Sequence, residues 1–183
     1  IQLQSLIEKA DLVVPDGIGV VWAGRQLGCP LPERVTGIDL ACRIFEEGHK
    51  HGWRIFLLGA RPGVAQKAMA TQQQKYPGIT FDSHHGYFAP EEEPRVIERI
   101  KKFKPDVLLA GLGAPKQEYW NYANPGIARV RMGVGGSFDV LSGEQRRAPR
   151  VFRQCNLEWL YRLIKEPARI RRQIILPLYV LKI

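Results

Sequence analysis

Residues 107–118 read Val107-Leu-Leu-Ala-Gly-Leu-Gly-Ala-Pro-Lys-Gln-Glu118, and Val130-Arg-Met-Gly-Val-Gly-Gly-Ser-Phe-Asp139 follows about one helix later. Each stretch is a short apolar run that ends in a glycine loop, which predicts a strand leaving a sheet. Glycine lets the backbone approach a ligand closely and adopt positive φ. Two such loops on neighbouring parallel strands therefore predict a crevice lined by backbone amides, and a nucleotide diphosphate fits that description.

Similar apolar runs alternate with helical patterns along most of the chain. This alternation predicts a mostly parallel sheet with helices on both faces, a Rossmann-like doubly wound α/β fold. The expected strands cover 12–14, 54–58, 79–82, 107–110 and 130–134, and the expected helices cover about 18–28, 37–51, 62–75, 90–103 and 115–123.

Composition places the chain among ordinary globular proteins. Its 183 residues are 45% hydrophobic and 25% charged, enough for one sizeable core. No apolar run approaches the roughly 20 residues that span a bilayer, and no signal peptide opens the sequence, so we expect a cytoplasmic protein. Its three cysteines are far apart and lack metal-ligand spacing, so we expect reduced, partly buried thiols.

The positive charge is concentrated at the C-terminal end. The formal charge is +9, and ten Lys/Arg against three Glu place +7 of it between Glu144 and Ile183. We therefore expect an α/β domain over 1–148 and a basic helical appendage over 149–183, interrupted at Pro167 and Pro177.

The appendage is also amphipathic. On a helix, Arg162, Lys165, Arg169 and Arg172 fall within an arc of about 80°, opposite leucine and isoleucine side chains. This pattern favours an anionic membrane surface as a partner. A helix docked on the body with a solvated basic face is the alternative. Apolar helix faces leave a homo-oligomer possible.

Longer strings carry a more specific signal. In order along nearly the whole chain, six stretches resemble the WecG/TagA/CpsF glycosyltransferase family. They are Asp11-Leu-Val-Val-Pro-Asp-Gly-Ile-Gly19, Pro32-Glu-Arg-Val-Thr-Gly37, His84-His-Gly-Tyr-Phe88, Gly111-Leu-Gly-Ala-Pro-Lys-Gln-Glu118, Gly133-Val-Gly-Gly-Ser-Phe-Asp139 and Glu158-Trp-Leu-Tyr-Arg-Leu-Ile-Lys-Glu-Pro167.

The resemblance implies roles for individual residues. Asp16, expected at the carboxyl end of the 12–14 strand, matches the family's general base, although an aspartate there could also cap the next helix. Arg34 becomes a candidate for phosphate binding. The family's appendage attaches the enzyme to the membrane and supplies arginines that complete the active site, and the matching positions are Arg162, Arg169 and Arg172.

The two glycine loops supply the expected substrate-binding residues. Their backbone donors would lie near the diphosphate, and Asp139 could accept a hydrogen bond from a ribose or sugar hydroxyl. A tight turn capped by Asp139 is the alternative. The residues are Gly111, Gly113, Gln117, Gly135, Gly136, Ser137, Phe138 and Asp139.

The sequence predicts neither a metal site nor a cofactor. No Asp-x-Asp stretch occurs, so protein groups would have to neutralise the leaving UDP. His84 and His85 lack a third ligand at suitable spacing, and we expect their loop to shape the sugar pocket.

The resemblance implies an inverting, metal-independent glycosyltransferase at the cytoplasmic membrane face. It would move N-acetylmannosamine from UDP to undecaprenyl-diphosphate-linked N-acetylglucosamine, making the linkage unit of wall teichoic acid. Another UDP-sugar, such as the uronic acid of N-acetylmannosamine, remains open as the donor. The resemblance also implies an additional strand and a threonine-containing loop before Ile1.

Two other classes fit less well. A dinucleotide-dependent oxidoreductase lacks support, since no Gly-x-Gly-x-x-Gly opens a helix after a strand. A nucleic-acid-binding module would need aromatic residues interleaved with the basic residues on a sheet face, and the tail lacks that pattern, so nucleic acid is not an expected partner.

Overall fold

The chain divides into two compact units. The computed structural model describes residues 2–155 and 157–165. The first unit combines the residues up to Val13 with Gly37–Gln145, and the second combines Val14–Thr36 with the described residues that follow Gln145.

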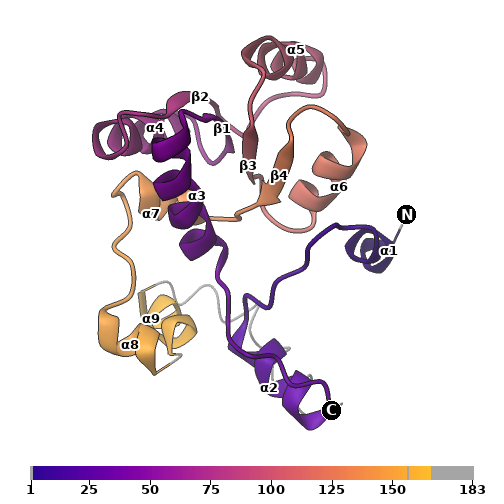
Figure 1. Ribbon diagram of the computed structural model, residues 1–183, viewed down its shortest axis with the longest axis vertical. Coiled ribbons are helices and arrows are strands. Elements are labelled where there is room, and N and C mark those ends of the chain that lie inside the picture. The colour runs from indigo at the N-terminus through magenta and orange to yellow at the C-terminus, as the bar shows by residue number, and fades with distance from the viewer. Residues whose placement is uncertain (1, 156, 166–183) are drawn as a thin grey trace. The chain divides into compact units, whose positions relative to one another are not determined.

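A four-stranded parallel sheet forms the centre of the first unit (Figure 1). Its strands are β1 (Arg54–Gly59), β2 (Thr80–His84), β3 (Val107–Gly111) and β4 (Val130–Gly133), in the order β2-β1-β3-β4. The two central strands pair with Leu57 opposite Leu109. The parallel order confirms the predicted Rossmann-like fold.

Helices cover both faces of this sheet. The side chains of β1 alternate, so that Ile55 and Leu57 pack on one face while Phe56 and Leu58 pack on the other. The first face is covered by α3 (Gly37–His51), α4 (Val64–Lys75) and α7 (Ser137–Leu141), and the second by α5 (Glu93–Phe103) and α6 (Lys116–Ala123). Figure 1 shows these two helical layers on opposite sides of the strands.

Four further helices complete the described chain. In the first unit, α1 (Leu3–Glu8) packs near α6, and the Lys9 ammonium donates to the Tyr122 hydroxyl at 3.2 Å. The second unit contains α2 (Ile18–Gln26), α8 (Arg150–Gln154) and α9 (Glu158–Lys165). Within the described ranges, no helix has both the length and the apolar character needed to cross a membrane.

The strand predicted over 12–14 was wrong. These residues are extended but belong to no strand, and Leu12 and Val13 are 75% and 59% exposed. A β-favouring composition makes a strand only where a neighbouring strand supplies a hydrogen-bonding partner. Asp16 therefore follows an irregular segment rather than a strand of the described sheet.

The described part of the predicted appendage contains two helices. Helices α8 and α9 cover 150–154 and 158–165. Arg162 lies on α9, whereas Arg169 and Arg172 lie outside the described residues. The role of all three arginines in the site remains a prediction.

Candidate active site

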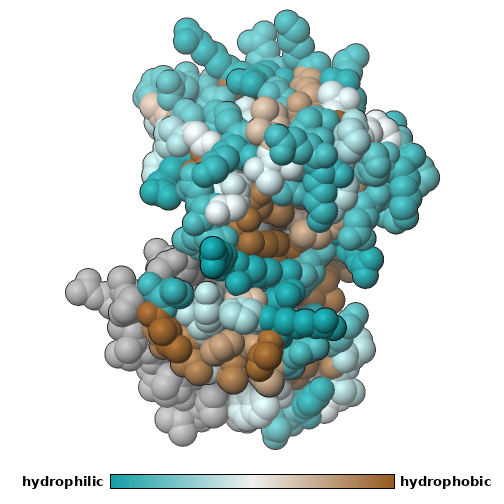
Figure 2. All heavy atoms as spheres, turned by 90° about the vertical axis from the view of Figure 1, so that its left-hand side faces the viewer, coloured by the Kyte–Doolittle hydropathy of each residue, from teal (hydrophilic) through white to brown (hydrophobic). Residues whose placement is uncertain are grey.

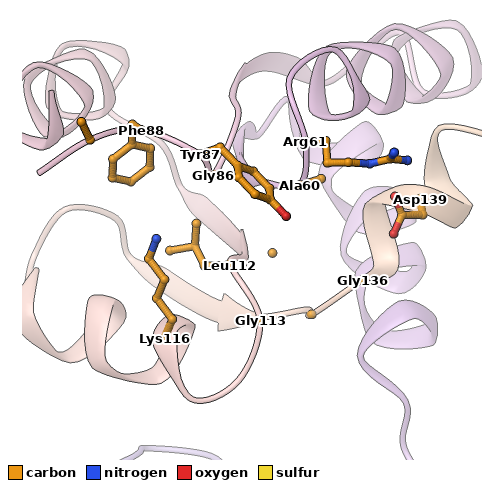
Figure 3. Close-up of a pocket in the computed structure, with 13 residues that line it drawn as sticks. Ala60, Arg61, Gly86, Tyr87, Phe88, Leu112, Gly113, Lys116, Gly136 and Asp139 are labelled. Atoms are coloured by element: carbon orange, nitrogen blue, oxygen red, sulfur yellow. The ribbon is translucent and has the colours of Figure 1, made fainter. Parts of the chain in front are cut away.

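A pocket of about 680 Å³ lies at the carboxyl ends of all four strands (Figure 3). This volume is within the range of small-molecule sites, about 300–1,000 Å³. The lining comes from the last residue of β3 and from the segments that follow the four strands: Ala60, Arg61, Gly86, Tyr87, Phe88, Ala89, Gly111, Leu112, Gly113, Lys116, Gly135, Gly136 and Asp139.

The sheet topology explains why the pocket forms there. From β1 the chain crosses through α4 to β2 on one side, and it later reaches β3 on the other side of β1 through α5. The loops leaving β1 and β3 therefore turn to opposite faces of the sheet. Such a switch point opens a crevice beyond the strand ends, where ligands of open α/β sheets bind.

Close contacts join the strand ends and loops around this pocket. A Cβ added to Gly59 would lie 2.4 Å from the backbone of Gly111, and one added to Gly86 would lie 2.7 Å from the Leu112 side chain. The Ala60 amide donates to the Gly111 carbonyl at 3.0 Å, and the Gly86 amide donates to the Ala60 carbonyl at 2.9 Å. Only glycine permits strand ends to approach this closely.

Charged and aromatic side chains lie around the opening. Lys116 Nζ lies 5.5 Å from the centroid of the Phe88 ring, and an Arg61 Nη lies 3.5 Å from Glu144 Oε2. In Figure 3, Lys116 and Phe88 lie on one side of the pocket, Arg61 and Asp139 lie on the other, and Tyr87 lies between them. A pocket with two cations, aromatic faces and glycine amides can hold a planar ring linked to phosphate groups.

Five of the predicted substrate-binding residues line the pocket, namely Gly111, Gly113, Gly135, Gly136 and Asp139. Three others support the pocket from outside its lining. Phe138 is fully buried against the sheet, and the Ser137 hydroxyl donates to the Val134 carbonyl at 2.6 Å. The third is Gln117.

Gln117 connects two of the pocket loops. Its side chain is buried, its Oε1 accepts a hydrogen bond from the Gly135 amide at 3.0 Å, and its Nε2 donates to Glu118 Oε1 at 2.9 Å. A Cβ on Gly133 would lie 2.6 Å from Gln117 Nε2. Gln117 therefore holds the loop after β4 against the first turn of α6.

Asp16 and Arg34 lie in the second unit. Asp16 is exposed and directly precedes Gly17, the N-cap residue of α2. Arg34 Nε donates to the Asp16 carbonyl at 2.6 Å, and an Arg34 Nη donates to Glu158 Oε2 at 3.0 Å. The structure thus brings together Asp16, Arg34 and the first residue of α9.

The chain is similar in sequence to known glycosyltransferases. The sequence model of the "Glycosyl transferase WecG/TagA/CpsF family" matches residues 2–183. The chain belongs to this family. Two Staphylococcus aureus proteins, from strains MW2 and NCTC 8325, are each 43% identical over 181 residues, covering 98% of this chain and 71% of theirs. Both are named N-acetylglucosaminyldiphosphoundecaprenol N-acetyl-beta-D-mannosaminyltransferase.

Sequence reasoning missed some pocket residues of this WecG/TagA/CpsF family member. Ala60 and Arg61 follow β1 in the stretch Gly59-Ala-Arg-Pro-Gly63, which is also an apolar strand ending in a glycine loop. Applying the same criterion to that stretch would have found them. Lys116 lay within a quoted motif, but its ammonium was not singled out.

The loop after the two histidines contributes to the pocket. Gly86, Tyr87 and Phe88 of the His84–Phe88 stretch line the pocket. His84 Nδ1 lies 2.8 Å from the His85 carbonyl. Across the part of the chain that the structure describes, no three His, Cys, Asp or Glu side chains are grouped to hold a metal ion.

Proposed function

We propose that this chain transfers N-acetylmannosamine from UDP to undecaprenyl-diphosphate-linked N-acetylglucosamine, in synthesis of the linkage unit of wall teichoic acid. The observation that carries the proposal is 43% identity, over 98% of the chain, to proteins named for this transfer. A pocket at the ends of four parallel strands supports it, because nucleotide ligands bind at that edge of such sheets.

The proposed reaction is a single displacement at the anomeric carbon of the donor sugar. A hydroxyl oxygen of the acceptor sugar forms the new bond, the bond from the anomeric carbon to the UDP oxygen breaks, and the configuration inverts. The Asp16 carboxylate takes the hydroxyl proton as general base. The electron pair of the broken bond leaves with UDP, so negative charge builds up on the UDP oxygen as the reaction proceeds.

Protein groups would stabilise the departing UDP. Positively charged side chains and backbone amides act most strongly where charge develops in the transition state. Lys116 and Arg61 line the pocket beside the glycine loops, and we assign them to the diphosphate together with the predicted arginines Arg162, Arg169 and Arg172. The absence of an Asp-x-Asp stretch from the sequence supports a metal-independent reaction.

We further propose that the chain works as a peripheral protein at the cytoplasmic face of the membrane that holds its lipid-linked acceptor. The second unit exposes large apolar side chains on α2 and α9, including Trp22, Trp159 and Ile164. Figure 2 shows one face of the molecule, on which apolar patches interrupt a hydrophilic surface. Exposed apolar residues, in a chain whose C-terminal sequence is basic, suit an anionic lipid surface.

The test is UDP release in the presence of UDP-N-acetylmannosamine, lipid-linked N-acetylglucosamine and EDTA, with Asp16→Asn as the control variant. We expect acceptor-dependent release that survives EDTA and collapses in the variant. Release only with another UDP-sugar would change the proposed donor. No release with any donor would overturn the proposed activity.

A further inference from the structure

A carboxylate is buried where α9 begins. Glu158, the first residue of that helix, is only 3% exposed. Its Oε2 lies 3.0 Å from an Arg34 Nη, and its Oε1 lies 3.8 Å from Arg147 Nε. A buried carboxylate with arginine partners is costly to disturb, because removing one partner leaves an uncompensated charge. The cluster therefore fixes its members relative to one another.

The same Arg34 side chain also holds the backbone of the proposed general base. Its Nε donates to the Asp16 carbonyl at 2.6 Å, and the neighbouring Val35 amide donates to the Pro15 carbonyl at 3.0 Å. The planar guanidinium keeps its N–H groups in a rigid fork, so one arginine can hold two acceptors at a fixed separation and orientation. Here those acceptors are the Asp16 carbonyl and the Glu158 carboxylate.

We propose that Glu158 is a positioning residue that acts on Asp16 through Arg34. Asp16 lies in an irregular segment, so neighbouring strands do not fix its place. The fork of Arg34 supplies that constraint, and Glu158 orients the fork. The first turn of α9 thereby fixes the position of Asp16, the proposed base. This inference rests on the proposed function, since it concerns the group assigned to take the acceptor proton.

The geometry favours this role over phosphate binding by Arg34. The Arg34 side chain is 18% exposed, and the Glu158 carboxylate 3.0 Å away offsets its charge. A phosphate-binding arginine would instead direct its fork to the ligand. The two roles also predict different kinetic defects. Loss of a phosphate contact weakens UDP binding, whereas loss of base positioning slows turnover and leaves UDP affinity intact.

The experiment uses the full chain with Glu158→Gln and Arg34→Lys. Glutamine keeps the shape of Glu158 but removes its charge, and lysine keeps the charge of Arg34 but removes its fork. Glu47→Gln is the matched control, because Glu47 makes an exposed ion pair with Lys50 on α3, at 2.7 Å. Turnover, the KM for UDP-N-acetylmannosamine, UDP affinity and backbone hydrogen exchange are measured for each protein.

We expect both cluster variants to lose turnover by about tenfold or more, because small misplacements of reacting groups are costly. UDP affinity should stay within about twofold of wild type. In an Asp16→Asn background, Glu158→Gln should cause no further loss, since it acts through Asp16. Hydrogen exchange at the Val35 amide should accelerate in both variants and remain unchanged in Glu47→Gln.

Full turnover in Glu158→Gln and Arg34→Lys would overturn the proposal. It would also be overturned if Glu158→Gln lowered the turnover of the Asp16→Asn variant by the same factor as it lowers that of wild type. If Glu158→Gln does not fold, Arg34→Lys carries the test alone. A wild-type chain without transferase activity would count against the proposed function. Hydrogen exchange at Val35 would still decide whether the cluster holds the Asp16 segment, and unchanged exchange would overturn that link.

Discussion

Replacing Gly111 by alanine should weaken both the fold and the pocket. The added Cβ would lie 2.9 Å from the Gly135 carbonyl oxygen and from two ring carbons of Phe138. Ordinary contacts begin near 3.4 Å, so these neighbours must move by about 0.5 Å in a packed interior. Phe138 is fully buried. Overpacking of this kind costs about 1–3 kcal/mol of unfolding free energy.

The displacement also affects the ligand site, because Gly111 and Gly135 both line the pocket. We expect UDP affinity to fall about tenfold, which corresponds to about 1.4 kcal/mol. Urea denaturation and calorimetric titration with UDP measure the two effects.

Gly126→Ala is the matched control. Gly126 has φ +74° and nothing within 4 Å of an added Cβ, and it precedes β4 at the strand end away from the pocket. The left-handed conformation should cost alanine about 1–2 kcal/mol in stability, with UDP affinity unchanged. Equal losses of UDP affinity in the two variants, or no loss in Gly111→Ala, would refute the reasoning.

Three further variants test other contacts. Lys116→Ala removes an ammonium from the pocket lining, so UDP should bind about fivefold more weakly, with a smaller difference at high salt; titrations at two salt concentrations check this. Gln117→Ala leaves the Gly135 amide without its acceptor and should lower the unfolding free energy by about 1–3 kcal/mol in urea. A hydrogen bond with Tyr76 raises the pKa of Lys75. Stabilisation from this pair should be complete below the pKa of an unfolded lysine, about 10.4, and be lost as the pH rises further. Urea denaturation at several alkaline pH values should show this loss of unfolding free energy in the wild type and not in Lys75→Gln.

The sheet could be predicted because its central strands are buried on both faces. Such strands appear in sequence as continuous apolar runs, as in 54–59 and 107–111. The glycine loops that follow 107–111 and 130–133 marked the edge of the sheet where the pocket lies. The run at 12–14 has similar composition, but no described strand pairs with it. Composition alone cannot show whether a partner strand is present.

The site was only partly predictable. The glycines and Asp139 followed from strand-end position, whereas the support that Gln117 gives to Gly135 depends on how α6 packs beside the loop after β4. The contact between Arg34 and Glu158 joins residues 124 positions apart. No periodicity or local spacing encodes such a pair, so only the fold could show it.

The most direct test of the account is the mass of the lipid-linked acceptor after incubation with the chain and UDP-N-acetylmannosamine. We predict that undecaprenyl-diphosphate-linked N-acetylglucosamine gains the mass of one N-acetylhexosamine residue, with EDTA present, and that the Asp16→Asn variant converts only a small fraction of it. An acceptor whose mass stays the same with the wild-type chain would contradict the proposed transfer.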